Sequence, residues 1–167
     1  FFVFWQRISN RKFLIIADIY GNIGNQLYLS CFLIKWSEEF NILSFNFGFT
    51  RNQHYFVKTQ KDFLLRYPSS KSFHNRRLQT QLAACINRIS LRLLKYKLVK
   101  SYQSIDLLDV KSESDFTSLE KRINENKLTF LRGFIHNQPY SIFRDHLAKI
   151  RVFFEVSKFY QSVVIET

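Results

Sequence analysis

Residues 13–47 carry the pattern that most constrains the fold: an apolar strand, a glycine turn, a helix and a second strand. Residues 13–19 (FLIIADI) form a nearly continuous apolar run, which is typical of a strand buried on both faces of a parallel sheet. Residues 27–40 repeat apolar side chains at three- and four-residue spacing, as a helix packed on a sheet requires. Residues 42–47 (ILSFNF) alternate apolar and polar side chains, as a strand does. The sequence therefore predicts an α/β fold.

The rest of the chain is less regular. It predicts a surface excursion over 50–72 and then an amphipathic basic helix over 77–99. A polar segment follows over 111–125, with Ser112, Ser114 and Asp115 as candidate helix caps. The last predicted elements are a strand over 128–134 and a helix that follows Pro139 and continues over 142–156. No internal repeat or low-complexity linker interrupts these segments, so we expect a single domain.

Composition limits the class of partner. With 167 residues and 46% hydrophobic residues, the chain can build one core. It has 25 Lys and Arg against 13 Asp and Glu, which gives a net charge of +12. Such a charge favours nucleotides, nucleic acid or acidic lipid headgroups, and charge alone does not choose among them.

Cysteine and histidine usage predicts neither a disulfide framework nor a metal site. Cys31 and Cys85 are far apart, and the four histidines show no metal-ligand spacing. The apolar residues 1–5 are far too few to span a bilayer, which takes about 20 residues. We therefore expect a cytoplasmic protein without a bound metal, with loose association at the inner face of the membrane as a further expectation.

The glycine turn is the candidate for ligand chemistry. Glycine lets the backbone approach a ligand closely, and the start of the following helix offers unpaired N–H groups to phosphate. The sequence G-N-I-G-N-Q over residues 21–26 fits neither the dinucleotide fingerprint nor the Walker pattern. The residues alone leave two interpretations open, a phosphate-binding loop and an ordinary tight turn.

Two segments resemble glycosyltransferase family 11, the α-1,2-fucosyltransferases. Residues 15–28 (IIADIYGNIGNQLY) are similar to the opening strand-G-x-x-G-N-Q-[LM]-[FY] of that family, and G-N-Q-L-Y is the specific part. Residues 131–140 (LRGFIHNQPY) are similar to its L-x-G-[YF]-x-Q-x-x-x-[YF] segment, with His136 in place of the usual Gln. Residues 50–127, between the two segments, match no pattern.

The resemblance implies a Rossmann-like parallel sheet flanked by helices, as the amino-terminal, acceptor-side lobe of a GT-B glycosyltransferase. It implies inverting, metal-independent transfer of L-fucose from GDP-fucose to a hydroxyl of a glycan acceptor, with no cofactor. The residues that it places at the donor are Gly21, Asn22, Ile23, Gly24, Asn25 and Gln26. Asn25 is the strongest of these, and Gln26 would contact the donor or cap the helix. The second segment adds Gly133, His136 and Tyr140.

The H-x-R-R-x-D segment of the family, which would bring arginine to the diphosphate, does not occur in these residues. Met is also absent. We therefore expect the amino-terminal part of a longer enzyme, inactive alone, and we assign no catalytic residue. The alternative is a basic nucleic-acid-binding module, because positive charge and aromatic side chains supply phosphate contacts and stacking surfaces. With no RNA-binding motif in the sequence, we expect no nucleic-acid partner.

Overall fold

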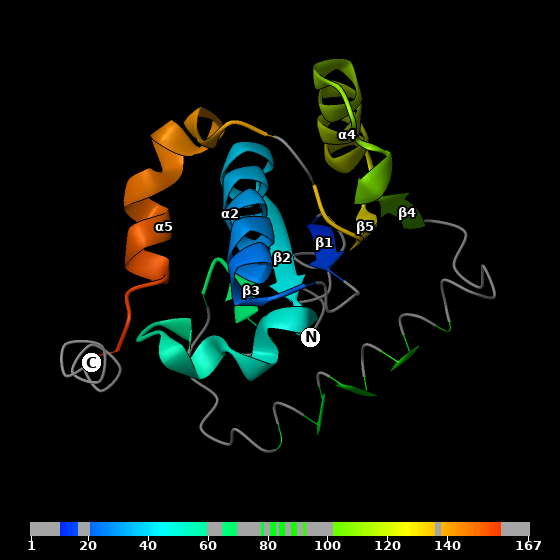
Figure 1. The fold of residues 1–167 in the computed structure, drawn as a ribbon. Helices are drawn as coiled ribbons and strands as arrows, with labels where there is room; N and C mark the ends of the chain where they lie inside the picture. Colours follow the sequence, from blue (N-terminus) through cyan, green and yellow to red (C-terminus); the bar gives the residue numbers. More distant parts are fainter. Residues whose placement is uncertain are drawn as a thin grey trace.

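A five-stranded sheet organises the chain (Figure 1). This computed structural model describes residues 11–16, 21–59, 65–69, 102–135 and 138–157, together with eight residues between 78 and 92. The strands are β1 (Lys12–Ile16), β2 (Ile42–Asn46), β3 (Arg66–Tyr67), β4 (Tyr102–Asp106) and β5 (Leu128–Arg132). Their order is β3-β2-β1-β5-β4, and all are parallel except β3, which pairs antiparallel with β2 at one edge. The predicted α/β class is confirmed.

Helix α2 (Ile23–Phe40) connects β1 to β2 and begins four residues earlier than the sequence predicts. The side-chain oxygen of Asn22 accepts a hydrogen bond from the backbone N–H of Asn25, and this cap fixes the start of the helix. At the other end Asn41 adopts a left-handed conformation with φ of 53°, and its N–H donates to the carbonyl of Ser37. Both ends of α2 are thus set by asparagine.

Helix α4 (Glu113–Glu125) confirms the predicted cap at Ser112. The hydroxyl of Ser112 accepts from the N–H of Asp115, and the Asp115 carboxylate accepts from the N–H of Ser112. Hydrogen bonds from Ser112 and Lys111 lower the pKa of Asp115, because they stabilise its charged form. The positive end of α4 therefore already has a carboxylate of its own.

The segment after Pro139 differs from the single helix that the sequence predicts. It begins as a 3₁₀ helix, η6 (Tyr140–His146), and only then becomes α5 (Leu147–Phe153). In a 3₁₀ helix residues three apart lie on one line. The ring of Phe143 packs on Phe32, with centroids 4.7 Å apart. One turn farther along the same line, Nε2 of His146 lies 3.2 Å from Oε1 of Glu39, so the 3₁₀ helix contacts α2 at two places.

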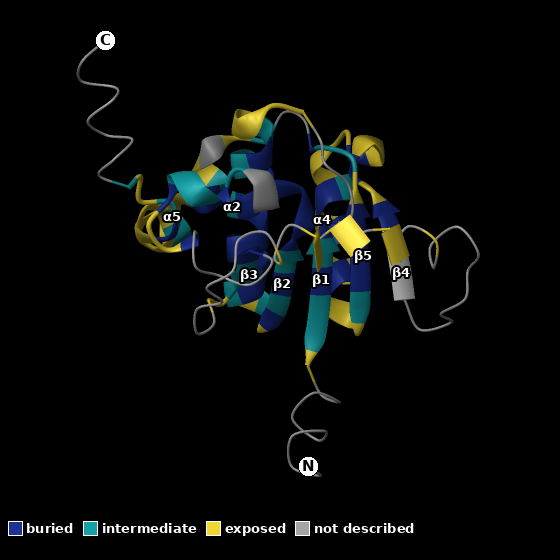
Figure 2. Ribbon diagram, turned by 90° about the horizontal axis from the view of Figure 1, so that it is seen from below, coloured by how far each residue is buried: buried dark blue, intermediate teal, exposed yellow. Residues whose placement is uncertain are grey.

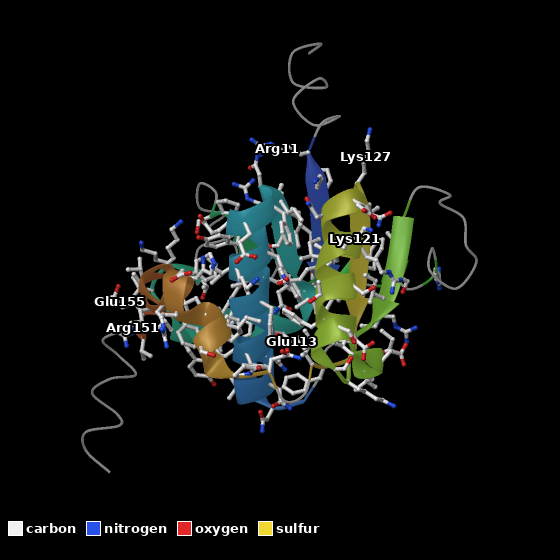
Figure 3. The ribbon with its side chains drawn as sticks, turned by 90° about the horizontal axis from the view of Figure 1, so that it is seen from above. Arg11, Glu113, Lys121, Lys127, Arg151 and Glu155 are labelled. Atoms are coloured by element: carbon white, nitrogen blue, oxygen red, sulfur yellow. The ribbon has the colours of Figure 1, made fainter. Side chains whose placement is uncertain are left out.

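Helices α2, α4 and α5 all cover the same face of the sheet. Figure 3 shows α2 and α4 side by side in front of the strands, with Glu113 and Lys121 marking α4, and Figure 2 shows the strands in front from the opposite side. The core between helices and sheet includes Leu14, Ile16, Phe32, Trp36, Phe116 and Leu131. The side chain of Lys35 is 8% exposed, and its Nζ lies 2.6 Å from both Glu39 and Glu120, which ties α2 to α4.

The predicted surface excursion contains short elements that pack on the domain. The 3₁₀ helices η1 (Phe47–Arg51) and η2 (Gln53–Tyr55) follow β2. The N–H of Val57 donates to the backbone carbonyl of Glu155, and the N–H of Ser157 donates to the backbone carbonyl of Tyr55. A second cluster, which comprises Ile34, Phe49, Phe56, Leu65 and Phe153, joins this segment to α2 and α5.

The structure also shows elements that the sequence pattern missed. Strand β4, followed by the 3₁₀ helix η5 (Leu107–Asp109), was not expected, and neither was β3. The predicted helix over 77–99 is supported at eight positions, all helical and exposed. The end of the first predicted strand and the residues beyond 157 lie outside the described part of the chain. Within the described part, no helix is both long and apolar enough to cross a membrane.

Candidate functional site

The predicted site lies between the end of β1 and the start of α2, at the carboxyl ends of the parallel strands. Because α2 begins at Ile23, only Gly21 and Asn22 belong to the bend, and Ile23, Gly24, Asn25 and Gln26 form the first turn of the helix. This corrects the expectation that the helix begins at Leu27. Residues 21–24 are exposed, and Asn25 is half-buried. The bend is therefore open to solvent.

Gly21 adopts a conformation that favours glycine. Its φ is +66°, in the left-handed region. A Cβ atom at this position would also lie 2.3 Å from Nδ2 of Asn25, because the Asn25 side chain folds back over the glycine. Gly24 is less constrained, since a Cβ there would make one tight contact, at 3.3 Å, with the side-chain oxygen of Asn22.

Asn22 and Gln26 both hold the bend in place. Asn22, and not Gln26, caps the helix, with its Oδ1 3.1 Å from the backbone nitrogen of Asn25. Gln26 is buried, and its Nε2 donates to the carbonyl of Gly21 at 3.2 Å. Its Oε1 accepts from Nδ2 of Asn52 at 2.8 Å. The Gln26 amide is thus engaged at both ends by the protein, which makes it a positioning residue in this arrangement.

A buried polar network beneath Gln26 was not predicted. Ser30 Oγ donates to the carbonyl of Gln26 at 2.8 Å, and Asn46 Nδ2 donates to Ser30 Oγ at 2.9 Å. Asn46 ends β2, and Asn52 follows it by one short helix. Polar residues at the end of the strand next to β1 were the available signal, because the carboxyl ends of parallel strands meet at one edge of the sheet.

The second predicted segment follows β5, which pairs directly with β1. Gly133 has φ of +78°, and a Cβ there would lie 2.7 Å from Oδ1 of Asp106. Tyr140 begins η6, whereas His136 lies outside the described residues. The hydroxyl of Tyr28 donates to the carbonyl of Gln138 at 2.9 Å. The two segments that resemble the same enzyme family therefore touch.

The electrostatics of the bend differ from those of the other long helix. The first turn of α2 contains no acidic residue, whereas the first turn of α4 contains Glu113 and Asp115. Among the described residues at this end of α2, the cap is the neutral side chain of Asn22, which leaves the positive end of the helix dipole uncompensated by a carboxylate of the first turn. Within the described residues, the side-chain amide of Asn25 has no hydrogen-bond partner, so it can donate to a ligand oxygen.

Two described cavities lie near this edge of the sheet. The larger, of about 540 Å³, lies between α2, α4 and η6, and its lining includes Lys35, Glu120 and Gln138. The smaller, of about 260 Å³, lies at the end of β4 and is lined by residues that include Asp106 and Arg122. Neither is lined by residues 21–26, so the bend lies outside both cavities. Tyr28, farther along α2, is bonded to Gln138, which forms part of the wall of the larger cavity.

Comparison with protein-family models, with curated proteins and with solved structures finds no match for this chain. The case for a function therefore depends on the geometry of the bend and on the resemblance of its residues. In the part of the chain that the structure describes, no group of three or more His, Cys, Asp or Glu side chains could hold a metal ion. The arrangement can offer backbone N–H groups, one free amide and a helix dipole to an anion.

Proposed function

We propose that this chain is the acceptor-side, amino-terminal lobe of a GT-B enzyme that transfers L-fucose from GDP-fucose to a glycan hydroxyl. The hydrogen bond between Tyr28 and the carbonyl of Gln138 carries the proposal. It brings the two segments with the family-like patterns together, although they are 110 positions apart in the chain. Unrelated chance matches have no reason to meet at the ends of adjacent parallel strands.

The bend supports an anionic ligand. The exposed backbone from Gly21 to Gly24 lies at the positive end of an 18-residue helix, where a phosphate oxygen is stabilised by N–H groups and by the dipole. In the proposed complex, Asn25 donates its side-chain amide to a phosphate or fucose oxygen. Gln26 keeps the Gly21 carbonyl turned inward, so that the backbone of the bend stays in one conformation.

The residues at the bend are neutral, so they orient the donor and do not supply the positive charge that the departing diphosphate requires. Stabilisation of that developing charge is usually the largest contribution to catalysis. We therefore propose that transfer needs residues in addition to those described here. This chain alone would bind the donor weakly and would not turn it over.

The test has two parts. The first uses the complete reading frame that contains this sequence and measures fucose transfer from GDP-fucose, for the parent protein and for Asn25→Ala. Asn124→Ala on α4 is the control, because its side chain is exposed and its Oδ1 accepts from Lys12 at the surface. We expect Asn25→Ala to lower kcat/KM at least tenfold and the control to retain activity. No transfer by the folded parent protein would disprove the proposed activity.

The second part separates the enzyme from a nucleic-acid-binding module. The chain is titrated with GDP and with single-stranded DNA at two salt concentrations. The proposal predicts binding of GDP that Asn25→Ala weakens. Tight DNA binding with a steep dependence on salt, and no GDP binding, would favour the nucleic-acid interpretation of the +12 charge.

A further inference from the structure

The larger cavity, between α2, α4 and η6, has the size and the mixed lining of a small-molecule site. Its volume of about 540 Å³ falls in the range usual for such sites, about 300–1,000 Å³. Pro139 and Ile142 give its wall apolar surface, and Lys35, Glu120 and Gln138 give it polar groups. Figure 3 looks onto this side of the sheet. The bend lies outside the cavity, so the cavity is a second place at which the domain can hold a ligand.

The core holds two of these polar groups in fixed positions. Lys35 Nζ lies 2.6 Å from Oε2 of Glu39 and 2.6 Å from Oε1 of Glu120, and the same Oε1 accepts from the indole N–H of Trp36 at 3.0 Å. These bonds use two of the three N–H donors of the ammonium group. Within the described residues, no donor reaches Oε2 of Glu120. A donor and an acceptor therefore lie side by side in the cavity wall, both available to a ligand.

The charge of the lining indicates the class of ligand. Lys35 and Lys111 balance Glu113 and Glu120, so an anion would meet two carboxylates and a cation would meet two ammonium groups. A hydroxyl group is both a donor and an acceptor, so it can accept from Lys35 and donate to Glu120 at once. The lining therefore favours a neutral molecule with several hydroxyl groups, which is the chemistry of a sugar.

The cavity extends towards the bend. Gln138 forms part of its wall and accepts from Tyr28 through its backbone carbonyl. Tyr28 is seven residues closer to the bend than Lys35 on α2, which is about 10 Å at 1.5 Å per residue. An occupant that reaches from Lys35 and Glu120 to Gln138 spans about that length, so it contains more than one sugar ring.

We propose that this cavity binds a neutral oligosaccharide, with Lys35 and Glu120 bonded to one hydroxyl group and the side-chain amide of Gln138 bonded to another, nearer to the bend. In the proposed enzyme this oligosaccharide is the fucose acceptor. That role rests on the proposed fucosyl transfer, whereas the binding does not. In transfer, an acceptor hydroxyl oxygen bonds to C1 of fucose, the bond from C1 to the diphosphate breaks with its electrons leaving on GDP, and the hydroxyl proton passes to water.

Trp36 provides a direct readout of binding, because its indole N–H is bonded to Glu120 in the cavity wall. The sequence has two tryptophans, so Trp5→Phe leaves Trp36 as the only indole. Its ¹⁵N–¹H signal is followed by NMR while the chain is titrated with lactose, cellobiose and maltose, without GDP-fucose. We expect a saturable shift with at least one of these disaccharides, and none with the cationic disaccharide of glucosamine or with anionic lactobionate. No shift with any neutral disaccharide would overturn the inference.

Two variants test whether the sugar lies in this cavity. Glu120→Gln replaces the free carboxylate oxygen with an amide that donates, and Ser141→Phe places a ring in the cavity from an exposed residue of its wall. Glu125→Gln on α4 and Ala148→Phe on α5 are the matched controls, because both residues are exposed and lie outside the cavity. We expect the first two variants to weaken disaccharide binding at least tenfold and the controls to leave it unchanged, with circular dichroism to confirm folding.

Ser141→Phe keeps the test decisive if Glu120→Gln does not fold. Equal affinities of Ser141→Phe and Ala148→Phe for the disaccharide would overturn the inference.

A transfer assay separates this inference from the proposed function. In the complete reading frame, Ser141→Phe should raise the KM for the disaccharide at least tenfold and leave the KM for GDP-fucose unchanged. Disaccharide binding by a protein that transfers no fucose would support the cavity as a sugar site and contradict only the proposed function. Transfer with an unchanged KM for the disaccharide in Ser141→Phe would overturn the inference and leave the proposed function in place.

Discussion

The hydroxyl of Tyr28 donates a 2.9 Å hydrogen bond to the backbone carbonyl of Gln138 and so joins α2 to the segment that follows β5. The Tyr28 ring also packs on Phe32 and Phe143, with centroids 5.1 and 5.7 Å away. This one side chain therefore fixes the position of the second segment by both polar and apolar contact. The larger cavity lies directly beside this junction, because Gln138 forms part of its wall.

Tyr28→Phe should remove the hydrogen bond and keep the ring contacts. We expect the free energy of unfolding to fall by about 0.5–1.5 kcal/mol, the usual net contribution of such a bond. Urea denaturation followed by circular dichroism measures the change. Tyr28→Ala, which also loses the ring packing, should cost more. An unchanged stability of Tyr28→Phe would contradict a contribution of the hydrogen bond to Gln138.

Gln26→Leu should destabilise the domain, because it leaves the carbonyl of Gly21 and the amide of Asn52 without their partner. We expect a loss of about 1–3 kcal/mol in the free energy of unfolding, the cost of unsatisfied polar groups. Gln81→Leu is the control, since Gln81 is exposed. A double-mutant cycle of Gln26→Ala with Asn52→Ala should show coupling of about 0.5 kcal/mol or more if the bond forms. Additive effects would contradict it.

The sequence predicted the central part of the fold well, because the deciding signals there are local. The apolar run of β1, the helical spacing of α2 and the capping residues before α4 each act over a few positions. Strand β4 (YQSID) was missed because it is a polar edge strand without an apolar pattern. The 3₁₀ winding of η6 was missed because it accompanies contacts with Phe32 and Glu39 on α2. These residues are far away in the sequence, so no local pattern reveals the contacts.

The bend was predictable in its location, whereas the contacts of its side chains were not. The glycines marked the bend correctly, since Gly21 needs its left-handed φ. The assignment of Gln26 as a donor contact or a cap did not anticipate its buried position. That position depends on a hydrogen bond with Asn52, which lies between two 3₁₀ helices. The sequence has no periodic pattern that predicts these helices. Spacing identifies which residues lie near a turn, and packing decides which of them are buried, as Gln26 is.

Gly21→Ala should destabilise the bend for two reasons, the left-handed φ and the close approach of Asn25. We expect a cost of about 1–3 kcal/mol in the free energy of unfolding from the strained conformation. Adding Asn25→Ala should recover the part due to the contact and not the part due to φ. Gly24→Ala is the matched control, which we expect to be neutral or stabilising by up to about 1 kcal/mol, because alanine favours a helix. Equal effects of the two single variants would contradict the geometry of Gly21.

The acid sensitivity of the domain should depend on Glu38, near the end of α2. Burial raises the pKa of this carboxyl, but hydrogen bonds from Lys149 and Tyr67 lower it more, so that the net pKa lies below its ordinary value of 4.5. A folded-state pKa below the unfolded value stabilises the protein above the unfolded pKa, and this stabilisation is lost as the pH falls through the folded pKa.

Glu38→Gln should therefore flatten the decline in the free energy of unfolding from about pH 5 to about pH 3, while lowering stability at neutral pH. Urea denaturation at a series of pH values measures both effects. Glu125→Gln is the control, because Glu125 is 60% exposed and its oxygen lies 3.9 Å from Lys121, where screening by water leaves little interaction. If Glu38→Gln and the parent chain lost stability in parallel over this range, Glu38 would not be held ionised by Lys149 and Tyr67, and the link between α2, α5 and β3 would have to be apolar.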